Sequence, residues 1–413
     1  MEQEYAFLSY LIPKNIKGTV FANMKGSMQD AADALQWHIY NGLCKNINQE
    51  IKILNILPVS SFPQYYKDPF IKEVTFDTAY NTENINIGYC NIKFIREYAK
   101  AFSAYRTLKK WLSQSKTPKT LFLYTASHAF LKAIQRLKND YDFDVCVIIA
   151  DLPNMKDLSS NKGSLIKLLE KLQSNDTYTL LSCVDYYVLL TKHMATYMKL
   201  DKPFSVMEGI STAQHEFSAP VYDSAVKTVF YAGMLHRKFG VLNLLEAFRR
   251  IPSPDYRLIL CGVGDGEDKI REAASQDSRI DFRGRLPREE VLKLQSQATV
   301  LVNPRQNNEE FTKYSFPSKN LEYLSSGIPF IAYKLDGIPD EYNDYILYVQ
   351  DNEIDTLTRR IMEICEMPAA DREQIGVKAR AFVSDYKNEV VQTKKILSLI
   401  EKAKSGYKSS TTK

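Results

Sequence analysis

The stretch NPRQNNEEFTKYSFPSKNLEYLSSGIP, from Asn303 to Pro329, decides how this chain is interpreted. It follows an apolar run that ends at Val302, as a buried strand would, and it opens with loop residues. Ser315 is expected to cap a helix, Pro317 fits its first turn, and Gly327 ends it. The stretch therefore predicts a strand, a loop and a short helix in succession.

One face of this helix has the groups that hold phosphate. Helical spacing places Ser318, Lys319 and Glu322 together, with Leu321 and Leu324 on the opposite side. A hydroxyl, a cation and unpaired backbone N–H groups at a helix N-terminus suit an anion. One turn on, Glu322 can accept two hydrogen bonds from a ribose diol. The same pattern also fits an ordinary surface helix with a Lys319–Glu322 ion pair.

Composition predicts a soluble protein of two or three domains, because the chain has 413 residues, 45% of them apolar and 25% charged. A net charge of +5 argues against a dedicated nucleic-acid-binding protein. The six cysteines show no C-x-x-C spacing, so buried free thiols in a reducing compartment are expected. The N-terminus lacks a signal-peptide pattern, and no apolar stretch is long enough to span a membrane. We therefore expect a cytoplasmic protein.

Strands and helices alternate along the chain, which indicates parallel sheets covered on both faces. The strands are predicted at Tyr5–Ile12, Ile51–Leu57, Glu73–Phe76, Leu121–Tyr124, Val145–Ile149, Tyr186–Leu190, Thr228–Ala232, Tyr256–Cys261, Ile280–Arg283, Thr299–Asn303 and Phe330–Tyr333. The helices are predicted from a Ser27 capping box to about Leu43 and at Asn91–Ser113, Ala129–Lys138, Ser164–Gln173, Val241–Arg250, Glu267–Ser275, Arg288–Gln297, Asp355–Glu366 and Ala369–Leu399.

A loop-like composition at Glu208–Val226 marks a linker between two domains. The predicted fold is α/β, with two tandem Rossmann-like doubly wound domains at residues 1–210 and 227–385. Their ligand is expected in a cleft across which they face each other. The helix at about 386–402 can pack back on the N-terminal domain, and residues 403–413 are expected to form a disordered tail.

Two glycine-containing turns follow strands in the second half. The first, AGMLHRKFG, contains Gly233, Arg237 and Lys238, and suits either a diphosphate or a solvated basic turn. The second, GVGDG, contains Gly264 but lacks the third glycine of a dinucleotide fingerprint, so a tight turn is the simple interpretation. The five histidines show no metal-ligand spacing, and no D-x-D follows a strand, so no metal site is predicted.

Residues 228–350 resemble the nucleotide-sugar half of family 4 glycosyltransferases with the GT-B fold. The resemblance lies in the order YAGMLHRKFGVLNLLEAF, LILCGVGDGEDKI, IDFRGRLPREEVLKLQSQATVLVNP and FPSKNLEYLSSGIPFIAYKLDGIPDEY. The segments IIADLPNM, VDYYVLLTKHMATYM and VMEGI of the first half are similar to the same group. The FPSK variant looks like members that build capsular polysaccharides and exopolysaccharides.

The resemblance implies a retaining, metal-independent hexosyltransferase without a cofactor. It would move a sugar from a nucleoside diphosphate to a hydroxyl of a glycan or lipid-linked glycan. Ser318 and Lys319, with Arg237 and Lys238, would hold the diphosphate, and Glu322 the ribose. Further donor contacts would come from Gly233, Gly264, Arg285, Leu286 and Tyr314. Asp151 would face the reacting sugar, with Lys319 as the second catalytic residue.

The sequence departs from the family pattern in three features. Tyr314 stands where the first of two glutamates is expected, and Glu310 is its nearest substitute. Met234 and Phe239 replace the usual Arg and Lys on the diphosphate. A histidine is replaced by Ala150–Asp151, where Asp151 either contacts sugar hydroxyls or caps a turn. Two alternatives therefore stay open: a non-catalytic partner that binds nucleotide or glycan, and a nucleotide-sugar hydrolase or epimerase.

The segment Asn91–Lys116 is predicted to be a basic amphipathic helix. It can lie on an anionic membrane, which would place the protein at the inner membrane face, or it can pack on the core with a solvated basic side. The expected basic side is Lys93, Arg96, Lys100, Arg106, Lys109, Lys110 and Lys116. The expected apolar side is Phe94, Ile95, Tyr98, Phe102, Tyr105, Leu108 and Leu112.

Overall fold

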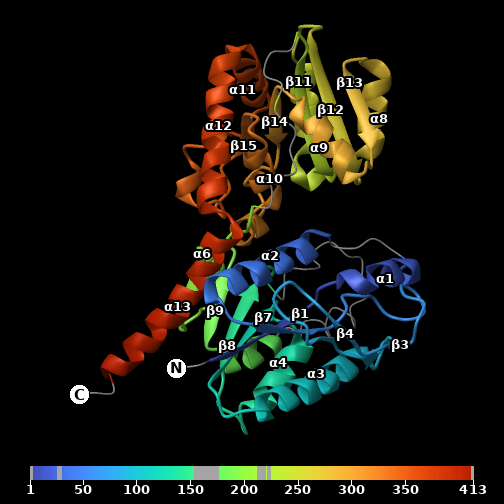
Figure 1. Cartoon of the computed structure of the whole chain (residues 1–413). Helices are drawn as coiled ribbons and strands as arrows, with labels where there is room; N and C mark the ends of the chain where they lie inside the picture. The colour runs from blue at the N-terminus through green and yellow to red at the C-terminus, as the bar shows by residue number, and fades with distance from the viewer. Residues whose placement is uncertain (1–2, 26–29, 153–175, 212–219, 221–224, 411–413) are drawn as a thin grey trace. The chain divides into compact units, whose positions relative to one another are not determined.

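The computed structural model describes residues 3–410, apart from 26–29, 153–175, 212–219 and 221–224 (Figure 1). Its contacts divide the chain into two compact units. Unit 1 is Met1–Glu208 together with Glu389–Lys413, and unit 2 is Gly209–Asn388. The Ser27 capping box, the Ser164–Gln173 helix and most of the Glu208–Val226 linker lie outside the described residues.

Unit 1 is built on a sheet with the strand order β10-β9-β8-β7-β1-β2-β5-β4. Its pairings are parallel except between β4 and β5, and a separate antiparallel pair joins β3 to β6. The strands are β1 (Glu4–Ser9), β2 (Ile51–Asn55), β3 (Phe70–Ile71), β4 (Val74–Phe76), β5 (Asn84–Asn86), β6 (Tyr89–Cys90), β7 (Lys119–Tyr124), β8 (Asp144–Ile149), β9 (Tyr186–Leu189) and β10 (Phe204–Val206).

Helices cover both faces of this sheet, as the alternation predicted (Figure 1). They are α1 (Lys17–Asn23), α2 (Asp30–Ile47), α3 (Arg96–Ser113), α4 (His128–Leu137), α6 (Lys192–Tyr197) and α13 (Glu389–Ser410), with short 3-10 turns η1 (Lys14–Ile16) and η2 (Leu181–Cys183). Helix α3 packs against α4, and α13 packs against α2. The C-terminal helix thus belongs to unit 1.

Unit 2 has an all-parallel sheet with the order β13-β12-β11-β14-β15-β16. The strands are β11 (Lys227–Met234), β12 (Tyr256–Val263), β13 (Ile280–Gly284), β14 (Val300–Asn303), β15 (Phe330–Tyr333) and β16 (Leu347–Val349). The helices are α7 (Val241–Arg249), α8 (Glu267–Gln276), α9 (Arg288–Ser296), α10 (Ser318–Ser326), α11 (Ile354–Glu366) and α12 (Ala369–Tyr386), with η3 (Arg237–Phe239), η4 (Glu310–Tyr314) and η5 (Asp340–Tyr342).

Two Rossmann-like units confirm the predicted fold class, while their arrangement across a cleft stays a prediction. In unit 2 the strand order changes direction between β11 and β14, which is the switch point where open sheets of this kind bind ligands. Apolar β-branched and aromatic residues fill these strands, so the sheet is buried on both faces and its polar groups gather at the strand ends.

The stretch Ala369–Leu399 is helical as predicted, but it is divided between two helices because the chain turns between α12 and α13. At this turn Lys387 is buried, with its Nζ 2.5 Å from Glu341 Oε1 and 4.7 Å from the centre of the Tyr342 ring. Lys387 therefore anchors the end of α12. The disordered tail predicted from residue 403 is wrong for residues 403–410, which continue α13 in a segment rich in lysine and free of proline.

All six cysteines are free, as predicted, and four of them are buried: Cys44, Cys146, Cys261 and Cys365. Among the described residues, no helix is long and apolar enough to cross a bilayer. In the same residues no group of histidine, cysteine and carboxylate side chains has the arrangement of a metal site.

Candidate functional site

Two loops contact each other at the switch point of unit 2. A Cβ on Gly240, which has a φ of 78°, would lie 2.0 Å from the Pro304 carbonyl oxygen. Only glycine permits this approach and this backbone conformation together. The loop after β11 therefore lies directly against the loop after β14, and side chains from both strands meet there.

Lys319 is a half-buried cation at this point. It is the second residue of α10, and its Nζ lies 5.3 Å from the centre of the Tyr323 ring and 5.9 Å from that of Tyr231. Within the part of the chain that the structure describes, this ammonium has no hydrogen bond and no salt bridge. Burial lowers the pKa of Lys319, and the charge of Glu322 opposes that change without an ion-pair contact.

Arg305 is a second half-buried cation, and sequence reasoning missed it. Its guanidinium lies 4.4 Å from the centre of the Phe311 ring and 5.4 Å from that of Phe239. One nitrogen, Nη2, donates to Ser315 Oγ at 2.9 Å, and buried Nε has no hydrogen-bond partner among the described residues. Burial lowers the pKa of Arg305 to about 10. No carboxylate within the described residues forms a salt bridge with this arginine.

The two cations act on the same tyrosine. Burial raises the pKa of Tyr231 to about 12, and the charge of Arg305 opposes this rise, while Lys319 lies over the ring. The Tyr231 hydroxyl donates to the Met234 carbonyl at 2.9 Å and fixes the ring at the end of β11. Two half-buried cations that have no carboxylate partner among the described residues are costly, and a bound anion would compensate their charge.

Ser315 does not cap the helix as predicted. Its Oγ accepts from Arg305 and donates to the Phe311 carbonyl at 3.1 Å. Helix α10 begins at Ser318 with Pro317 as its N-cap, and no side chain caps it. The predicted diphosphate ligand Ser318 is therefore an exposed residue at an uncapped helix start, where backbone N–H groups are left for an anion.

Arg237 and Lys238 lie in the loop after β11, but they are exposed. The Arg237 amide donates to Asp265 Oδ1 at 2.7 Å, which lowers the pKa of that carboxyl. A Cβ on Gly264 would lie 2.3 Å from the Leu235 carbonyl carbon. Gly264 therefore serves contact between the protein's own loops, and Lys238 lies over Phe239 at 5.3 Å.

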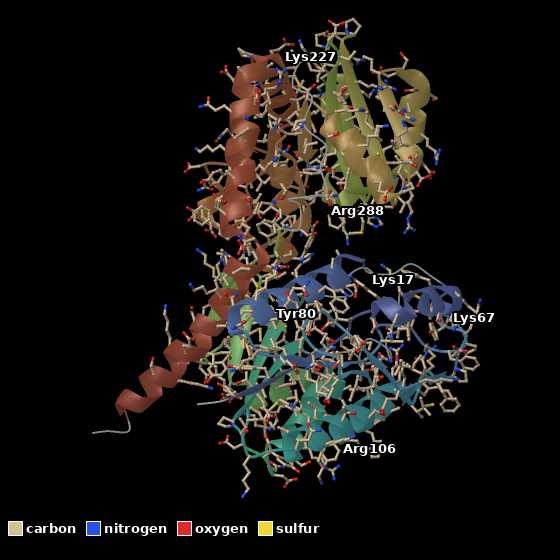
Figure 2. The ribbon with its side chains drawn as sticks, viewed as in Figure 1. Lys17, Lys67, Tyr80, Arg106, Lys227 and Arg288 are labelled. Atoms are coloured by element: carbon tan, nitrogen blue, oxygen red, sulfur yellow. The ribbon has the colours of Figure 1, made fainter. Side chains whose placement is uncertain are left out.

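Glu322 has a partner that the sequence did not indicate. Its Oε2 lies 3.1 Å from Arg288 Nη1, at the start of α9 (Figure 2). The carboxylate is partly exposed, so the pair lies at the rim of the site. Arg285 and Leu286 lie in the loop between β13 and α9. Arg285 is exposed, and Leu286 packs on the core.

Tyr314 ends the 3-10 helix η4, which begins at Glu310. The Tyr314 hydroxyl donates to Glu310 Oε1 at 3.3 Å. The short helix thus carries a carboxylate beside the tyrosine that replaces the expected glutamate. Asp151 belongs to unit 1, where it is exposed beyond the end of β8, and its charge adds to the burial-driven rise in the pKa of Tyr124. Asp151 and the predicted donor-binding residues thus belong to different units.

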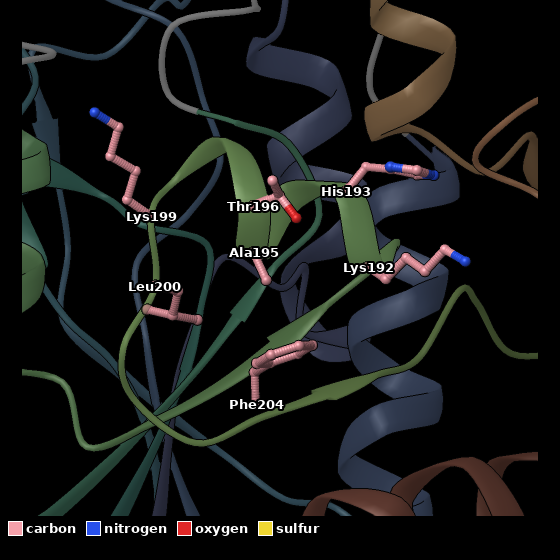
Figure 3. A pocket seen from close by; sticks show the side chains of 7 residues that line it. All are labelled: Lys192, His193, Ala195, Thr196, Lys199, Leu200 and Phe204. Atoms are coloured by element: carbon pink, nitrogen blue, oxygen red, sulfur yellow. The ribbon is translucent and has the colours of Figure 1, made fainter.

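Unit 1 has a separate surface hollow of about 430 Å³ between α6 and β10 (Figure 3). It is lined by Lys192, His193, Ala195, Thr196, Lys199, Leu200 and Phe204. Figure 3 shows the side chains of Lys192 and Lys199 extending in different directions, so their ammonium groups do not converge on one point. The hollow thus differs from the paired cations at the switch point.

Comparison with known proteins defines the class. Residues 215–382 match the family model described as glycosyl transferases group 1. Together with the two Rossmann-like units, this match confirms the resemblance to family 4 glycosyltransferases of the GT-B fold.

A curated relative is the O-antigen chain mannosyltransferase B of Escherichia coli, which is 24% identical over 140 residues. That alignment covers 32% of this chain and only 35% of the relative. Sucrose-phosphate synthase from Thermosynechococcus elongatus has a similar structure, with a TM-score of 0.63, 15% identity and coverage of 98% of this chain and 100% of that one. A lipopolysaccharide outer core galactosyltransferase in its apo form gives a TM-score of 0.60 at 14% identity, covering 97% and 100%.

Proposed function

We propose that this chain is a glycosyltransferase that moves a hexose from a nucleoside diphosphate to a hydroxyl of a glycan or lipid-linked glycan. The reaction would retain the anomeric configuration and need neither a metal ion nor another cofactor. Its place would be the synthesis of cell-surface polysaccharide, in the cytoplasm at the inner face of the membrane. The group 1 match and the names of the polysaccharide-building relatives support this class of reaction.

One observation carries the proposal: Lys319 and Arg305 are half-buried cations at the switch point of a parallel sheet, and neither has a carboxylate partner among the described residues. A diphosphate has the charge to compensate both cations, and the uncapped start of α10 adds N–H donors. As the bond from the anomeric carbon to the diphosphate breaks, negative charge accumulates on the leaving oxygen. Positive groups held in place stabilise that charge most where water is excluded.

Other groups have secondary roles in this proposal. Glu322 binds the ribose from the rim, where Arg288 holds its carboxylate in position. Glu310 and Tyr314 contact the donor sugar in place of the usual glutamate. Asp151 faces the reacting sugar from unit 1. The acceptor hydroxyl forms the new bond to the anomeric carbon and releases its proton as the diphosphate departs.

A non-catalytic partner is the second candidate, and Met234, Phe239 and Tyr314 favour it because charged family residues are missing there. The test begins with a thermal-shift screen of nucleotide sugars on the purified full chain, since a bound donor raises the unfolding temperature. Release of nucleoside diphosphate is then measured with and without polyprenyl-linked glycan acceptors. Release that depends on acceptor is the expected result, and the anomer of the product is determined by NMR.

Each contrary outcome has a defined meaning. Release of nucleoside diphosphate without any acceptor would identify a hydrolase. Binding of the donor without release of nucleoside diphosphate would identify the non-catalytic partner. Arg305→Met is expected to abolish acceptor-dependent release while the protein stays folded. Arg283→Met is the matched control, because Arg283 is an exposed arginine of the same unit paired with Asp281 at 2.8 Å.

A further inference from the structure

Helix α3 of unit 1 presents an aromatic stripe to solvent. The side chains of Phe94, Tyr98 and Phe102 are 84%, 76% and 62% exposed. Their four-residue spacing places them in one row, which begins in the turn before α3 and continues along the helix. Of the two alternatives for this helix, packing of the apolar side on the core holds for Leu108 and Leu112 but not for this row.

Helix α3 buries a different face, which includes a lysine. Lys100 is buried, with its Nζ 5.6 Å from the centre of the Tyr10 ring and 5.5 Å from that of Tyr89. It lies 3.2 Å from Glu97 Oε1, which compensates its charge. Behind it, Leu108 and other residues of the same face are buried. Because Lys100 points inward, the row of Tyr98 and Phe102 points outward.

Neighbouring segments extend the stripe into a larger surface. Strand β3 pairs with β6 so that Phe70 lies opposite Cys90, and the Asn91 amide donates to the Pro69 carbonyl at 2.7 Å. Phe70, itself 64% exposed, therefore lies beside the chain that enters α3. We call this surface the aromatic face. Its exposed members are Phe70, Ile92, Phe94, Ile95, Tyr98 and Phe102.

Cations border the aromatic face and lie over its rings. Lys93 Nζ is 5.7 Å from the centre of the Phe94 ring, and the Arg106 guanidinium is 5.9 Å from that of Phe102. Exposed Lys109 and Lys110 follow on the same helix. Figure 2 places Arg106 on the outer side of α3.

The acid nearest to these rings does not cancel the positive charge. Glu97, the one acid in the sequence of α3, is within salt-bridge distance of both Arg96, at 2.9 Å, and Lys100. The exposed acids Asp68 and Glu73, near Phe70, are accompanied by the exposed lysines Lys67 and Lys72. The aromatic face therefore keeps a positive border.

We propose that the aromatic face is a docking surface for an anionic lipid bilayer. Exposed apolar surface of this extent marks an interaction site. Aromatic rings with flanking lysines and arginines match the boundary between headgroups and acyl chains, and the cations attract anionic lipid. A second copy of the chain fits less well, because a symmetric contact would bring the positive borders together.

The experiment measures co-sedimentation of the full chain with vesicles of phosphatidylcholine alone and of phosphatidylcholine with phosphatidylglycerol. Binding is expected only to the anionic vesicles, and it should weaken as salt rises. The triple variant Phe94→Ser, Tyr98→Ser, Phe102→Ser should lose about tenfold or more of this binding. Arg106→Gln with Lys109→Gln and Lys110→Gln should weaken it at physiological salt and flatten the salt dependence.

The matched control is Tyr386→Ser, an aromatic side chain that is 59% exposed on α12 of unit 2. It should bind vesicles like the wild type, and circular dichroism should show that every variant is folded. Wild-type protein that ignores anionic vesicles, or a triple variant that binds them equally well, would overturn the proposal. A triple variant that turns a dimer into a monomer without losing lipid would assign the face to self-association. The assay contains no donor, so its failure would leave the proposed sugar transfer untouched.

Discussion

Gly233 leaves the space in which the Lys319 side chain lies. A Cβ on residue 233 would be 2.8 Å from Lys319 Cε and 3.2 Å from Nζ. Gly233 is near the end of β11 and Lys319 is in the first turn of α10, so the strand and the helix are in close contact here. The absence of a side chain at Gly233 therefore determines where the Lys319 ammonium lies.

Gly233→Ala should move that ammonium and weaken binding of uridine diphosphate, or of the nucleoside diphosphate that the donor screen identifies, by about tenfold or more. The physical reason is that Lys319 must shift to make room for the added methyl group. Isothermal titration calorimetry measures the change. Gly18→Ala is the control, because a Cβ there meets nothing within 4 Å. Equal affinities for Gly233→Ala and the wild type would contradict this account of the site.

Lys319→Met should change stability and binding in opposite directions. The lowered pKa means that the folded protein holds this proton less tightly than the unfolded chain, so the charged lysine destabilises the fold at neutral pH. We expect the variant to gain about 1 kcal/mol of unfolding free energy. Its affinity for nucleoside diphosphate should fall about tenfold or more. Urea unfolding and calorimetry measure the two quantities.

The exposed Lys293 of α9 provides the comparison for that experiment. Lys293→Met removes a lysine of the same unit that lies outside the proposed anion site. The free energy of unfolding and the affinity for nucleoside diphosphate should therefore stay near the wild-type values. If Lys319→Met instead lost stability, Lys319 would be a structural residue and the argument for an anion site would fail.

Nucleoside diphosphate binding should weaken as pH rises through the lowered pKa of Lys319. An anion stabilises the charged form, so binding takes up a proton once the free lysine has begun to deprotonate. The pH range in which this change occurs lies below 10.5, the ordinary pKa of a lysine. Lys319→Arg keeps its charge at these pH values and should bind with a flatter pH profile. Parallel profiles for the two proteins would assign the titration to another group.

The strand–helix alternation predicted most of the fold, and it placed Lys319 at a helix start after β14. Arg305 was missed because in the sequence it is simply a loop residue. Its burial depends on Phe239 and Phe311, which come from two loops that meet only in the folded unit. The sequence around Arg305 contains no information about such a contact.

The orientation of α3 shows a second limit of sequence reasoning. Helical periodicity predicted a basic and an apolar stripe, but the buried face takes Lys100 from the first and Leu108 and Leu112 from the second. The burial of Lys100 depends on the rings of Tyr10 and Tyr89, which come from other parts of unit 1. Those rings reach the lysine only once the sheet has formed.

Glu322→Ala should separate recognition of the ribose from recognition of the diphosphate. We expect the variant to bind nucleoside diphosphate about tenfold more weakly, since two hydrogen bonds to the diol are lost. Inorganic pyrophosphate has no ribose, so its affinity should change little. Equal losses for both ligands would mean that Glu322 acts by positioning Arg288, whose Nη1 is 3.1 Å away.

Glu389 should make the stability of unit 1 depend on pH. Its carboxylate joins α13 to α2, with Oε2 3.0 Å from His38 Nδ1 and Oε1 2.6 Å from Lys45 Nζ. Burial alone would raise the pKa of Glu389, but the hydrogen bonds from His38 and Lys45 outweigh it and lower that pKa. The stabilisation is therefore present above the unfolded value near 4.5 and is lost as pH falls through the lower folded value.

Glu389→Gln should cost about 1 kcal/mol of unfolding free energy at pH 7, because a charge-assisted contact is lost from a partly buried pair. The difference from wild type should shrink in acid, where the wild-type carboxylate takes up its proton. Both tryptophans, Trp37 and Trp111, belong to unit 1, so fluorescence during urea unfolding reports on this unit alone. Glu401→Gln, an exposed change on the same helix, should show no such pH-dependent difference. A penalty for Glu389→Gln that is equally large at pH 7 and in acid would mean that packing, rather than charge, holds α13 on α2.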